Sequence, residues 1–288
     1  MSELAAGGSA ASPMLIGEHV NIGGKTLIDS LEESRGRGAT CAQIFTKSPR
    51  SFDLKSRFTD EDCAEVKKWS RRNSFPIVIH GSYLINLAIP TEAMIDSLVE
   101  DLHLATKMGA QGVVIHMGKH LKKIPVEEAV VNFRKNICSA IDRARVGVRG
   151  LRKVILETPA GQGSELFGDN IREFVTFCSS FPAKYRPYIG VCLDTCHIWA
   201  SGATLEETLD LVRESRLEIT TIHVNDSKNN KGDQVDRHET IGEGKIPSRS
   251  LAHFVAEFCH KIPCVLETPD LDKREHELEW MKRSCGGH

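Results

Sequence analysis

Residues 154–159 read Val-Ile-Leu-Glu-Thr-Pro, and residues 264–269 read Cys-Val-Leu-Glu-Thr-Pro. Each stretch contains a short, continuous apolar run, which is typical of a strand buried on both faces of a parallel sheet. A glutamate follows each run, Glu157 in the first and Glu267 in the second, and a proline then ends the strand. The same arrangement, a buried strand that ends at an ionisable side chain, recurs along the chain.

Short apolar runs alternate with amphipathic segments over nearly the whole sequence. The strand-like runs cover residues 14–16, 42–45, 77–79, 112–115, 154–156, 189–193, 221–224 and 264–266. Segments with helical apolar spacing cover residues 60–70, 92–107, 126–144, 171–179, 205–215, 251–260 and 276–282. This alternation predicts a parallel sheet. Eight such units favour a closed barrel over an open sheet, so we predict an α/β fold, a single (β/α)8 TIM barrel with its active site at the carboxyl-terminal rim of the strands.

The composition restricts the function classes. The chain has 288 residues and a formal net charge of −2, from 37 Lys and Arg against 39 Asp and Glu. This balance excludes a strongly basic, histone-like chain but allows nucleic-acid binding through a local basic face. Nine scattered cysteines without a Cys-x-x-Cys pair favour a reducing, intracellular compartment, cytoplasm or nucleus. No run of about 18 apolar residues is present, so we expect no transmembrane helix and no membrane partner.

The sequence predicts one folded domain. Residues 1–13 are rich in Ala, Gly and Ser, lack the features of a signal peptide, and are expected to form a disordered tail. No linker interrupts the strand–helix repeat after this tail, so residues 14–288 are expected to form the barrel. Because such a barrel buries its own core, we expect a monomer.

Ionisable side chains stand at or just past the ends of the predicted strands. They are His19, His80, His116, Glu157, Asp194, His223 and Glu267. In a parallel barrel these ends point to one rim, so the side chains would converge there, as metal ligands do. Two pairs add to the set: Asp194 with His197 about one helical turn apart, and Asp236 with His238 on one side of an extended loop.

From these positions we predict nine metal ligands: His80, His116, Glu157, Asp194, His197, His223, Asp236, His238 and Glu267. One zinc ion takes three or four nitrogen or oxygen ligands, so nine suit three ions when carboxylates bridge. Imidazole and carboxylate donors fit Zn, Mn, Fe or Co. We expect His19 and His120 to support the site rather than bind metal, and Cys192 and Cys196 to be buried as small hydrophobes.

Longer motifs surround these residues. They are HGSYLINL at 80–87, LETPAGQG at 156–163, LDTCH at 193–197, VDRH at 235–238 and IGEG at 241–244. In this order they resemble the signatures of the endonuclease IV family, zinc-dependent DNA endonucleases that act at abasic sites on a (β/α)8 barrel. The resemblance runs from about residue 16 to residue 267. The chain departs from the family pattern at Ser48-Pro49, Met117 and Thr158-Pro159, none of which is a predicted ligand.

The resemblance implies a centre of three zinc ions, for which Mn or Fe could substitute. The three ligand sets that it implies are His80, His116 and Glu157; Glu157, Asp194, His223 and Glu267; and His197, Asp236 and His238. Glu157 would then bridge two ions. Glu157 and Glu267 would be the catalytic residues, because either can orient the attacking water.

The resemblance also implies a double-stranded DNA partner with abasic sites. Tyr83, Leu84 and Arg50 match the positions that enter the DNA at the gap left by the lost base. Lys47 and Arg237, in loops after strands, are candidates for contacts with backbone phosphates. The implied reaction in base excision repair is hydrolysis of the phosphodiester 5′ to the abasic site. It leaves a 3′-OH and a 5′-deoxyribose phosphate, and 3′-diesterase and 3′–5′ exonuclease activities could accompany it.

Two alternatives stay open. Metal-dependent sugar isomerases and epimerases of the same barrel superfamily use a related ligand set, here Glu157, Asp194, His223 and Glu267. The five further predicted ligands and the Tyr83–Leu84 pair favour the nuclease. A non-catalytic scaffold that binds DNA lesions could keep the fold, but such derivatives usually lose ligands, and the set here is complete.

Overall fold

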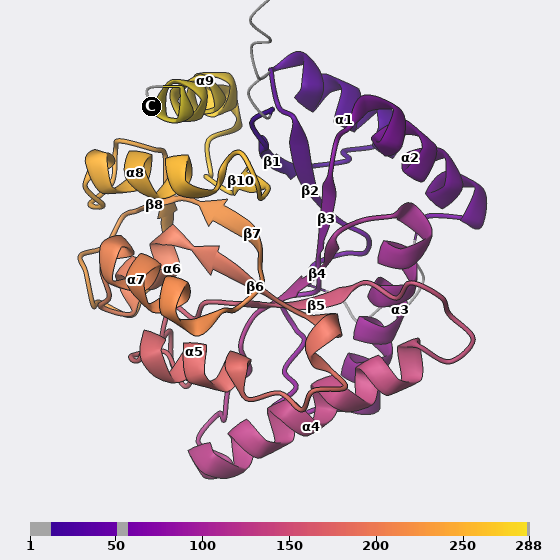
Figure 1. The fold of residues 1–288 in the computed structure, drawn as a ribbon, viewed down its shortest axis with the longest axis vertical. Coiled ribbons are helices and arrows are strands. Elements are labelled where there is room, and N and C mark those ends of the chain that lie inside the picture. The colour runs from indigo at the N-terminus through magenta and orange to yellow at the C-terminus, as the bar shows by residue number, and fades with distance from the viewer. Residues whose placement is uncertain (1–12, 51–56, 287–288) are drawn as a thin grey trace, which may run out of the picture.

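A computed structural model describes residues 13–50 and 57–286 and contains a closed barrel of parallel strands (Figure 1). The order around the barrel is β1-β10-β7-β6-β5-β4-β3-β2. The strands are β1 (Ile16–Val20), β2 (Cys41–Phe45), β3 (Ile77–His80), β4 (Gly112–Ile115), β5 (Lys153–Glu157), β6 (Ile189–Asp194), β7 (Ile219–Val224) and β10 (Cys264–Leu266). The predicted TIM barrel is confirmed. The predicted tail lies outside the described residues up to residue 12.

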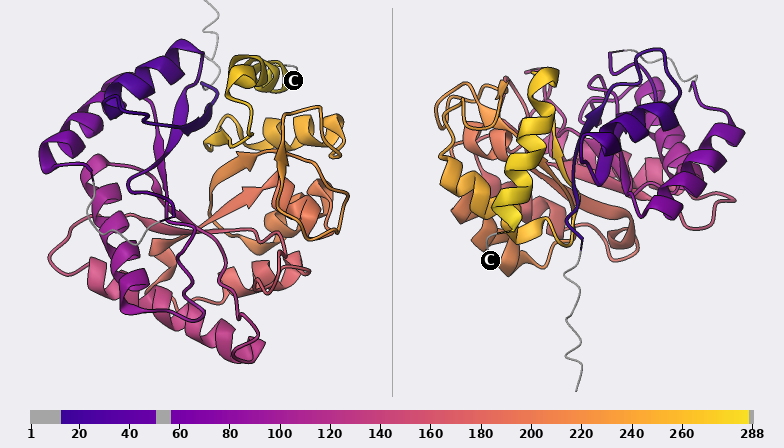
Figure 2. Two further views of the ribbon diagram at one scale, coloured as in Figure 1. Left: turned by 180° about the vertical axis from the view of Figure 1, so that it is seen from behind. Right: turned by 90° about the horizontal axis from the view of Figure 1, so that it is seen from above.

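Helices surround the barrel (Figure 1). They are α1 (Leu27–Gly36), α2 (Asp60–Asn73), α3 (Glu92–Met108), α4 (Val126–Ala144), α5 (Ile171–Ser179), α6 (Thr195–Ala200), α7 (Leu205–Ser215), α8 (Ser248–Phe258) and α9 (Arg274–Cys285), with short 3-10 turns η1 (Arg186–Tyr188) and η2 (Leu271–Lys273). The sequence did not predict α1, which buries two leucines and two serines, or α6, which has six residues. The C-terminal α9 packs beside β1 and completes the ring (Figure 2).

The first strand begins at Ile16, whereas the sequence predicted residues 14–16. The apolar pattern failed here because Glu18 and His19 lie inside the strand. Glu18 is buried and accepts a hydrogen bond from Arg37 Nε at 3.0 Å. His19 Nδ1 lies 3.0 Å from the side-chain amide of Gln43 on β2. Each polar side chain therefore has a partner that compensates for its burial.

Local capping decides several helix ends. Thr59 and Thr204 begin α2 and α7 in capping boxes. Gly109 ends α3 in the left-handed region at φ 73°, where a side chain would be strained. Asn170 begins α5, where its side chain accepts a hydrogen bond from Glu173 N.

Side-chain alternation along the strands produces layers inside the barrel. Val78, Val114, Ile155 and Cys192 pack together in the barrel interior. The residues two positions later, on the same face, are His80, His116, Glu157 and Asp194. An apolar floor therefore lies below a polar rim, which is the usual layering of this fold. No helix among the described residues is both long and apolar enough to cross a membrane.

Candidate metal centre

The parallel register brings the predicted metal ligands to one rim. Asp194 at the end of β6 pairs with His223 on β7, and His80 at the end of β3 pairs with Phe45 on β2. Donor atoms that lie within 4.8 Å of one another form five groups, and two of these include a cysteine, Cys192 or Cys196. The three groups made only of imidazoles and carboxylates are His80, His116 and Glu157; Glu157, Asp194, His223 and Glu267; and His197, Asp236 and His238. The grouping matches the three implied ligand sets, while metal binding by these residues stays a prediction.

Glu157 lies where the first two groups meet. Its Oε2 is 3.1 Å from His116 Nε2 and 3.6 Å from His80 Nε2. Its Oε1 is 2.7 Å from His223 Nδ1. The side chain is buried, and Oε2 has no hydrogen-bond partner within the described part of the chain. A carboxylate with one oxygen toward each group is suited to bridge two metal ions.

The second group is buried except for Glu267, which is partly exposed at the mouth. His223 Nδ1 lies 3.1 Å from Glu267 Oε2 and 3.7 Å from Asp194 Oδ2. Burial by itself lowers the pKa of His223, but the neighbouring Cys192 thiol and Glu267 carboxylate raise it well above its ordinary value. Burial by itself raises the pKa of Glu157 and Glu267, but the facing imidazole of His223 holds both below their usual range. The group therefore favours positive charge at its centre, from protons or from a metal cation.

The third group is built around Asp236, which follows the loop after β8 (Asp226–Ser227) and precedes β9 (His238–Glu239). Asp236 Oδ2 is 3.4 Å from His197 Nε2, and its Oδ1 is 3.2 Å from His238 Nε2. Burial by itself raises the pKa of Asp236, but His197 and His238 lower it far below its usual range. Burial by itself lowers the pKa of His238, whereas Asp236 and Asp194 raise it to about 9.

The imidazoles are oriented as metal ligands usually are. His80 Nδ1 donates to Gly81 O at 2.8 Å, and His197 Nδ1 donates to Thr158 O at 2.9 Å. Metal-binding histidines commonly donate their second ring nitrogen in this way. Among residues 13–50 and 57–286, the buried Nε2 atoms of His197 and His238 have no hydrogen-bond partner. The donor set and its orientation therefore fit a multi-metal centre.

Comparisons with known proteins show the family of this chain. A family profile described as "Xylose isomerase-like TIM barrel" matches residues 31–284. A protein of Acanthamoeba polyphaga mimivirus assigned as an endonuclease 4 is 33% identical over 276 residues, which cover 88% of this chain and 85% of the relative. The chain belongs to the endonuclease IV family. The crystal structure of endonuclease IV from Thermus thermophilus has a TM-score of 0.78 to it at 29% identity, with 96% of this chain and 100% of that chain covered.

Proteins with a different assigned activity have the same architecture. A D-tagatose 3-epimerase-like protein has a TM-score of 0.72 at 16% identity, with 95% of this chain and 97% of that chain covered. At this identity the likeness shows the fold alone. The barrel fold alone therefore does not distinguish the endonuclease IV family from the epimerases. The side chains at the rim must distinguish them.

This endonuclease IV family member also places uncharged side chains against the donor groups, and the sequence analysis did not predict them. Asn225 donates to Asp194 Oδ2 at 2.7 Å and accepts from Glu267 N at 3.0 Å. Gln43 donates to Glu267 Oε1 at 2.6 Å. Asn225 follows the end of β7 two residues after His223, so its position was a usable signal. Gln43 lies within an otherwise apolar strand and carries no such signal.

Four residues near the predicted ligands stay outside the three donor groups: His19, His120, Cys192 and Cys196. Cys192 and Cys196 are buried beside the carboxylates and imidazoles, as expected. Burial raises the pKa of each thiol to about 12, which disfavours the thiolate that binds metals. His120 lines a separate hollow beside the rim and belongs to none of the three groups.

A hollow of about 500 Å³ opens onto the donor groups, and Tyr83, Lys119, Lys228 and Arg237 contribute to its walls. Tyr83 is 46% exposed and Leu84 is 38% exposed, although both are large side chains. The Tyr83 ring packs edge-on against His80, with ring centroids 5.3 Å apart. An exposed ring held from below in this way is available to an approaching ligand. Arg50 is also exposed.

Lys47 does not lie on this surface, contrary to the prediction that it contacts DNA. Its side chain is buried, and Nζ donates to Ser97 O at 2.8 Å and lies 3.1 Å from Asp101 Oδ1. Thr46 donates to the same Asp101 oxygen at 2.6 Å. The ammonium group is therefore half of an internal ion pair that ties the loop after β2 to α3.

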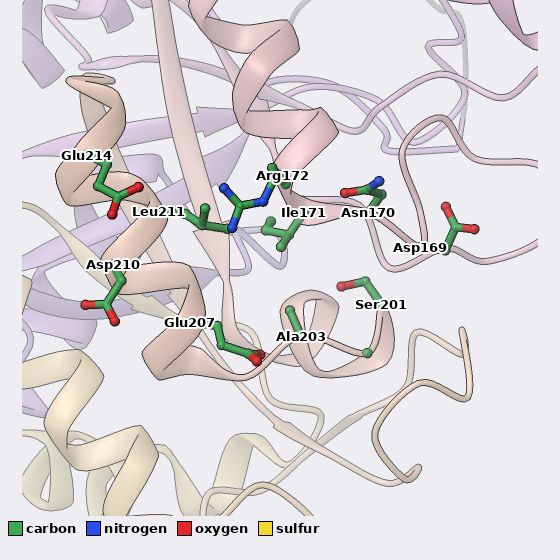
Figure 3. A pocket seen from close by; sticks show the side chains of 11 residues that line it. Asp169, Asn170, Ile171, Arg172, Ser201, Ala203, Glu207, Asp210, Leu211 and Glu214 are labelled. Carbon is green, nitrogen blue, oxygen red and sulfur yellow. The ribbon is translucent and has the colours of Figure 1, made fainter.

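Another hollow, of about 470 Å³, lies on the outer side of the barrel between α5 and α7 (Figure 3). Arg172 extends across it toward Leu211, and the acidic residues Glu207, Asp210 and Glu214 come from α7. None of the predicted site residues lines this hollow. The rim therefore remains the candidate functional site.

Proposed function

We propose that this protein is a zinc-dependent AP endonuclease of base excision repair. It hydrolyses the phosphodiester 5′ to an abasic site in double-stranded DNA and leaves a 3′-OH and a 5′-deoxyribose phosphate. The observation that carries the proposal is the set of three adjoining donor groups, two of which share the buried Glu157. Relatives assigned as endonuclease 4 at 32–33% identity support it.

The centre would hold three zinc ions, one for each donor group, and its imidazole and carboxylate donors also suit Mn or Fe. When bound, zinc supplies Lewis acidity toward the phosphate and lowers the pKa of water. Glu157 and Glu267 are the proposed catalytic residues. Their buried carboxylates, held unprotonated beside His223, orient the attacking water and accept its hydrogen bonds.

The mouth of the centre is suited to damaged DNA. Tyr83, Leu84 and Arg50 enter the duplex at the abasic gap, at a cost of a few kcal/mol for unstacking. Arg237, with Lys119 and Lys228 on the same walls, contacts phosphates. The same centre could process 3′-blocked ends as a 3′-diesterase or 3′–5′ exonuclease. We further propose that residues 14–288 act as a single domain in a monomer, and inside the cell, where its DNA substrate is found.

The sugar isomerase alternative is weaker. It accounts for the second donor group alone. Two further donor groups would have no role in such an enzyme, one with His80 and His116 and one with His197, Asp236 and His238. Small-sugar chemistry also gives no role to the exposed Tyr83 at the mouth.

The test is cleavage of a duplex oligonucleotide that carries one tetrahydrofuran abasic analogue. This analogue cannot undergo β-elimination, so a lyase leaves it intact. We expect cleavage on its 5′ side with a 3′-OH product, and loss of cleavage after chelation. Intact substrate after incubation with zinc-loaded protein would overturn the proposal.

A further inference from the structure

Gln43 is a fully buried amide in the middle of β2, and each of its polar atoms faces the proposed metal centre. Its Oε1 lies 2.8 Å from His223 Nε2, and its Nε2 lies 2.6 Å from Glu267 Oε1 and 3.0 Å from His19 Nδ1. We infer that Gln43 is a positioning residue that sets the orientation of two metal ligands, His223 and Glu267. This inference rests on the proposed function.

The carboxylate of Glu267 fixes the orientation of the Gln43 amide. An ionised Glu267 side chain can only accept hydrogen bonds, so the donor Nε2 of Gln43 must face it. The carbonyl Oε1 then necessarily faces His223. His19 Nδ1 takes the second N–H of the amide, so both donors and the acceptor of Gln43 are satisfied.

The amide in turn fixes the ring of His223. Because Gln43 Oε1 can only accept, Nε2 of His223 must carry a proton and donate it. The other ring nitrogen of His223, Nδ1, then faces the second donor group. It lies 2.7 Å from Glu157 Oε1 and 3.1 Å from Glu267 Oε2. A neutral imidazole of this tautomer presents its lone pair toward the metal position.

The acceptor for the second ring nitrogen of His223 must come from a side chain. In His80 and His197 a backbone carbonyl holds Nδ1 and leaves Nε2 for the donor group, whereas in His223 the two ring nitrogens have the opposite roles. His223 lies within β7, where the neighbouring strands β6 and β10 use the backbone groups for the sheet. An amide that reaches across the barrel from β2 supplies the acceptor that the local backbone does not.

The same amide also gives the two carboxylate oxygens of Glu267 different partners. Gln43 holds Oε1, while Oε2 faces His223 Nδ1 at 3.1 Å. One oxygen is therefore committed to the protein and the other is directed at the donor group. Partners of this kind typically contribute 10- to 100-fold to metal affinity.

The test replaces the amide with a side chain of similar length that has no hydrogen bonds to offer. We expect Gln43→Met to retain two zinc ions firmly and to hold the third about 10- to 100-fold more weakly. The readout is zinc content by mass spectrometry after equilibration with graded concentrations of a chelator. Thr221→Val is the matched control, because it removes a buried hydrogen bond to Pro263 O on the same β7 without touching the donor groups.

A second variant separates positioning from general destabilisation. Gln43→Glu keeps an acceptor for His223 Nε2 but places a carboxylate against Glu267. We expect ring ¹⁵N spectra of the zinc-loaded proteins to show the Nε2–H tautomer of His223 in wild type and Gln43→Glu, and a shifted mixture in Gln43→Met. Because this signature reports on the ring itself, a loss of folding stability alone does not reproduce it.

The outcomes separate the inference from the proposed function. If wild type binds three zinc ions and cleaves abasic DNA, but Gln43→Met resists chelation as well as wild type, the inference is wrong and the function stands. If wild type holds no zinc at these ligands, the proposed function fails, and the inference fails with it.

Discussion

Glu157 faces imidazoles that come from three different strand ends, His80, His116 and His223. Burial removes the water that would otherwise solvate its charge, so its neighbours must supply the compensation. Its low pKa and the raised pKa of His223 are two sides of this one interaction. At the scale of single residues, the centre is an arrangement of charges that a metal cation would complete.

The charge of Glu157 is therefore open to a direct test. Glu157→Gln keeps the shape of the side chain but removes the charge and the second metal-binding oxygen. We expect cleavage of abasic DNA to fall by at least about 100-fold, together with loss of bound zinc. Glu165→Gln is the control, because this carboxylate lines the same mouth outside the three donor groups. Equal zinc content and equal cleavage rates in the two variants would contradict the proposed role.

The pKa of His238 predicts how the metal-free protein responds to pH. Its value in the folded protein, about 9, lies above the ordinary value of 6.5. The proton on His238 therefore stabilises the fold fully below pH 6.5, and this contribution is lost as the pH rises through 9. Urea unfolding of the chelated protein should show a decreasing free energy of unfolding across this window. Zinc affinity should increase across the same window, because zinc competes with that proton. A flat stability profile would rule out the Asp236–His238 pair as the source of the shift.

At the scale of elements, two loops form one unit at the mouth. Pro49 O in the loop after β2 accepts hydrogen bonds from Tyr83 N at 3.0 Å and from Ser82 Oγ at 2.9 Å. The loop is also fastened to α3 through Lys47 and Asp101. The segment that leads to Arg50 and the segment that carries Tyr83 are therefore connected before DNA binds, which reduces the entropy that binding must overcome.

Lys47→Met tests the internal role of this lysine. Removal of the ammonium group leaves the Asp101 carboxylate buried without its counter-ion, and we expect a loss of about 3 kcal/mol of unfolding free energy. Chemical denaturation measures it. Lys123→Met, at an exposed lysine in a neighbouring loop, should change stability little. A Lys47→Met protein with wild-type stability but a weaker salt dependence of DNA binding would restore the original interpretation of Lys47 as a phosphate contact.

At the scale of the whole molecule, the donor groups connect parts of the chain that are far apart. The second group alone joins β5, β6, β7 and the end of β10. Metal bound there stabilises the folded protein only, by about 4 kcal/mol when free zinc is about 1,000 times its Kd. Chelation should therefore lower the Tm by several degrees, and added zinc should restore it. An unchanged Tm after verified zinc removal would argue against a metal that spans the strands.

The net charge of −2 gives the molecule as a whole no attraction for DNA. Binding must then depend on the cations at the mouth, and the affinity for abasic duplex should fall steeply with salt. Arg237→Gln should reduce the slope of log K against log salt by about 1. Fluorescence anisotropy between about 50 and 200 mM salt measures the slope. A slope near zero for wild type would exclude phosphate contacts as the main source of affinity.

The sequence by itself determined the barrel and the rim. Strands buried on both faces must be apolar throughout, and parallel strands must bring their carboxyl ends together, so Glu157, Asp194 and His223 could be placed on one rim without coordinates. The family resemblance already implied how the nine predicted ligands divide into groups, but only the tertiary structure shows their donor atoms within 4.8 Å of one another, because such distances depend on how the strands pack. The tertiary structure also shows that Lys47 is buried. The sequence did not predict this, because its partner Asp101 lies on a helix that is remote in sequence. Gln43 acquired its role from partners 180 and 224 residues away, and no local pattern carries such information.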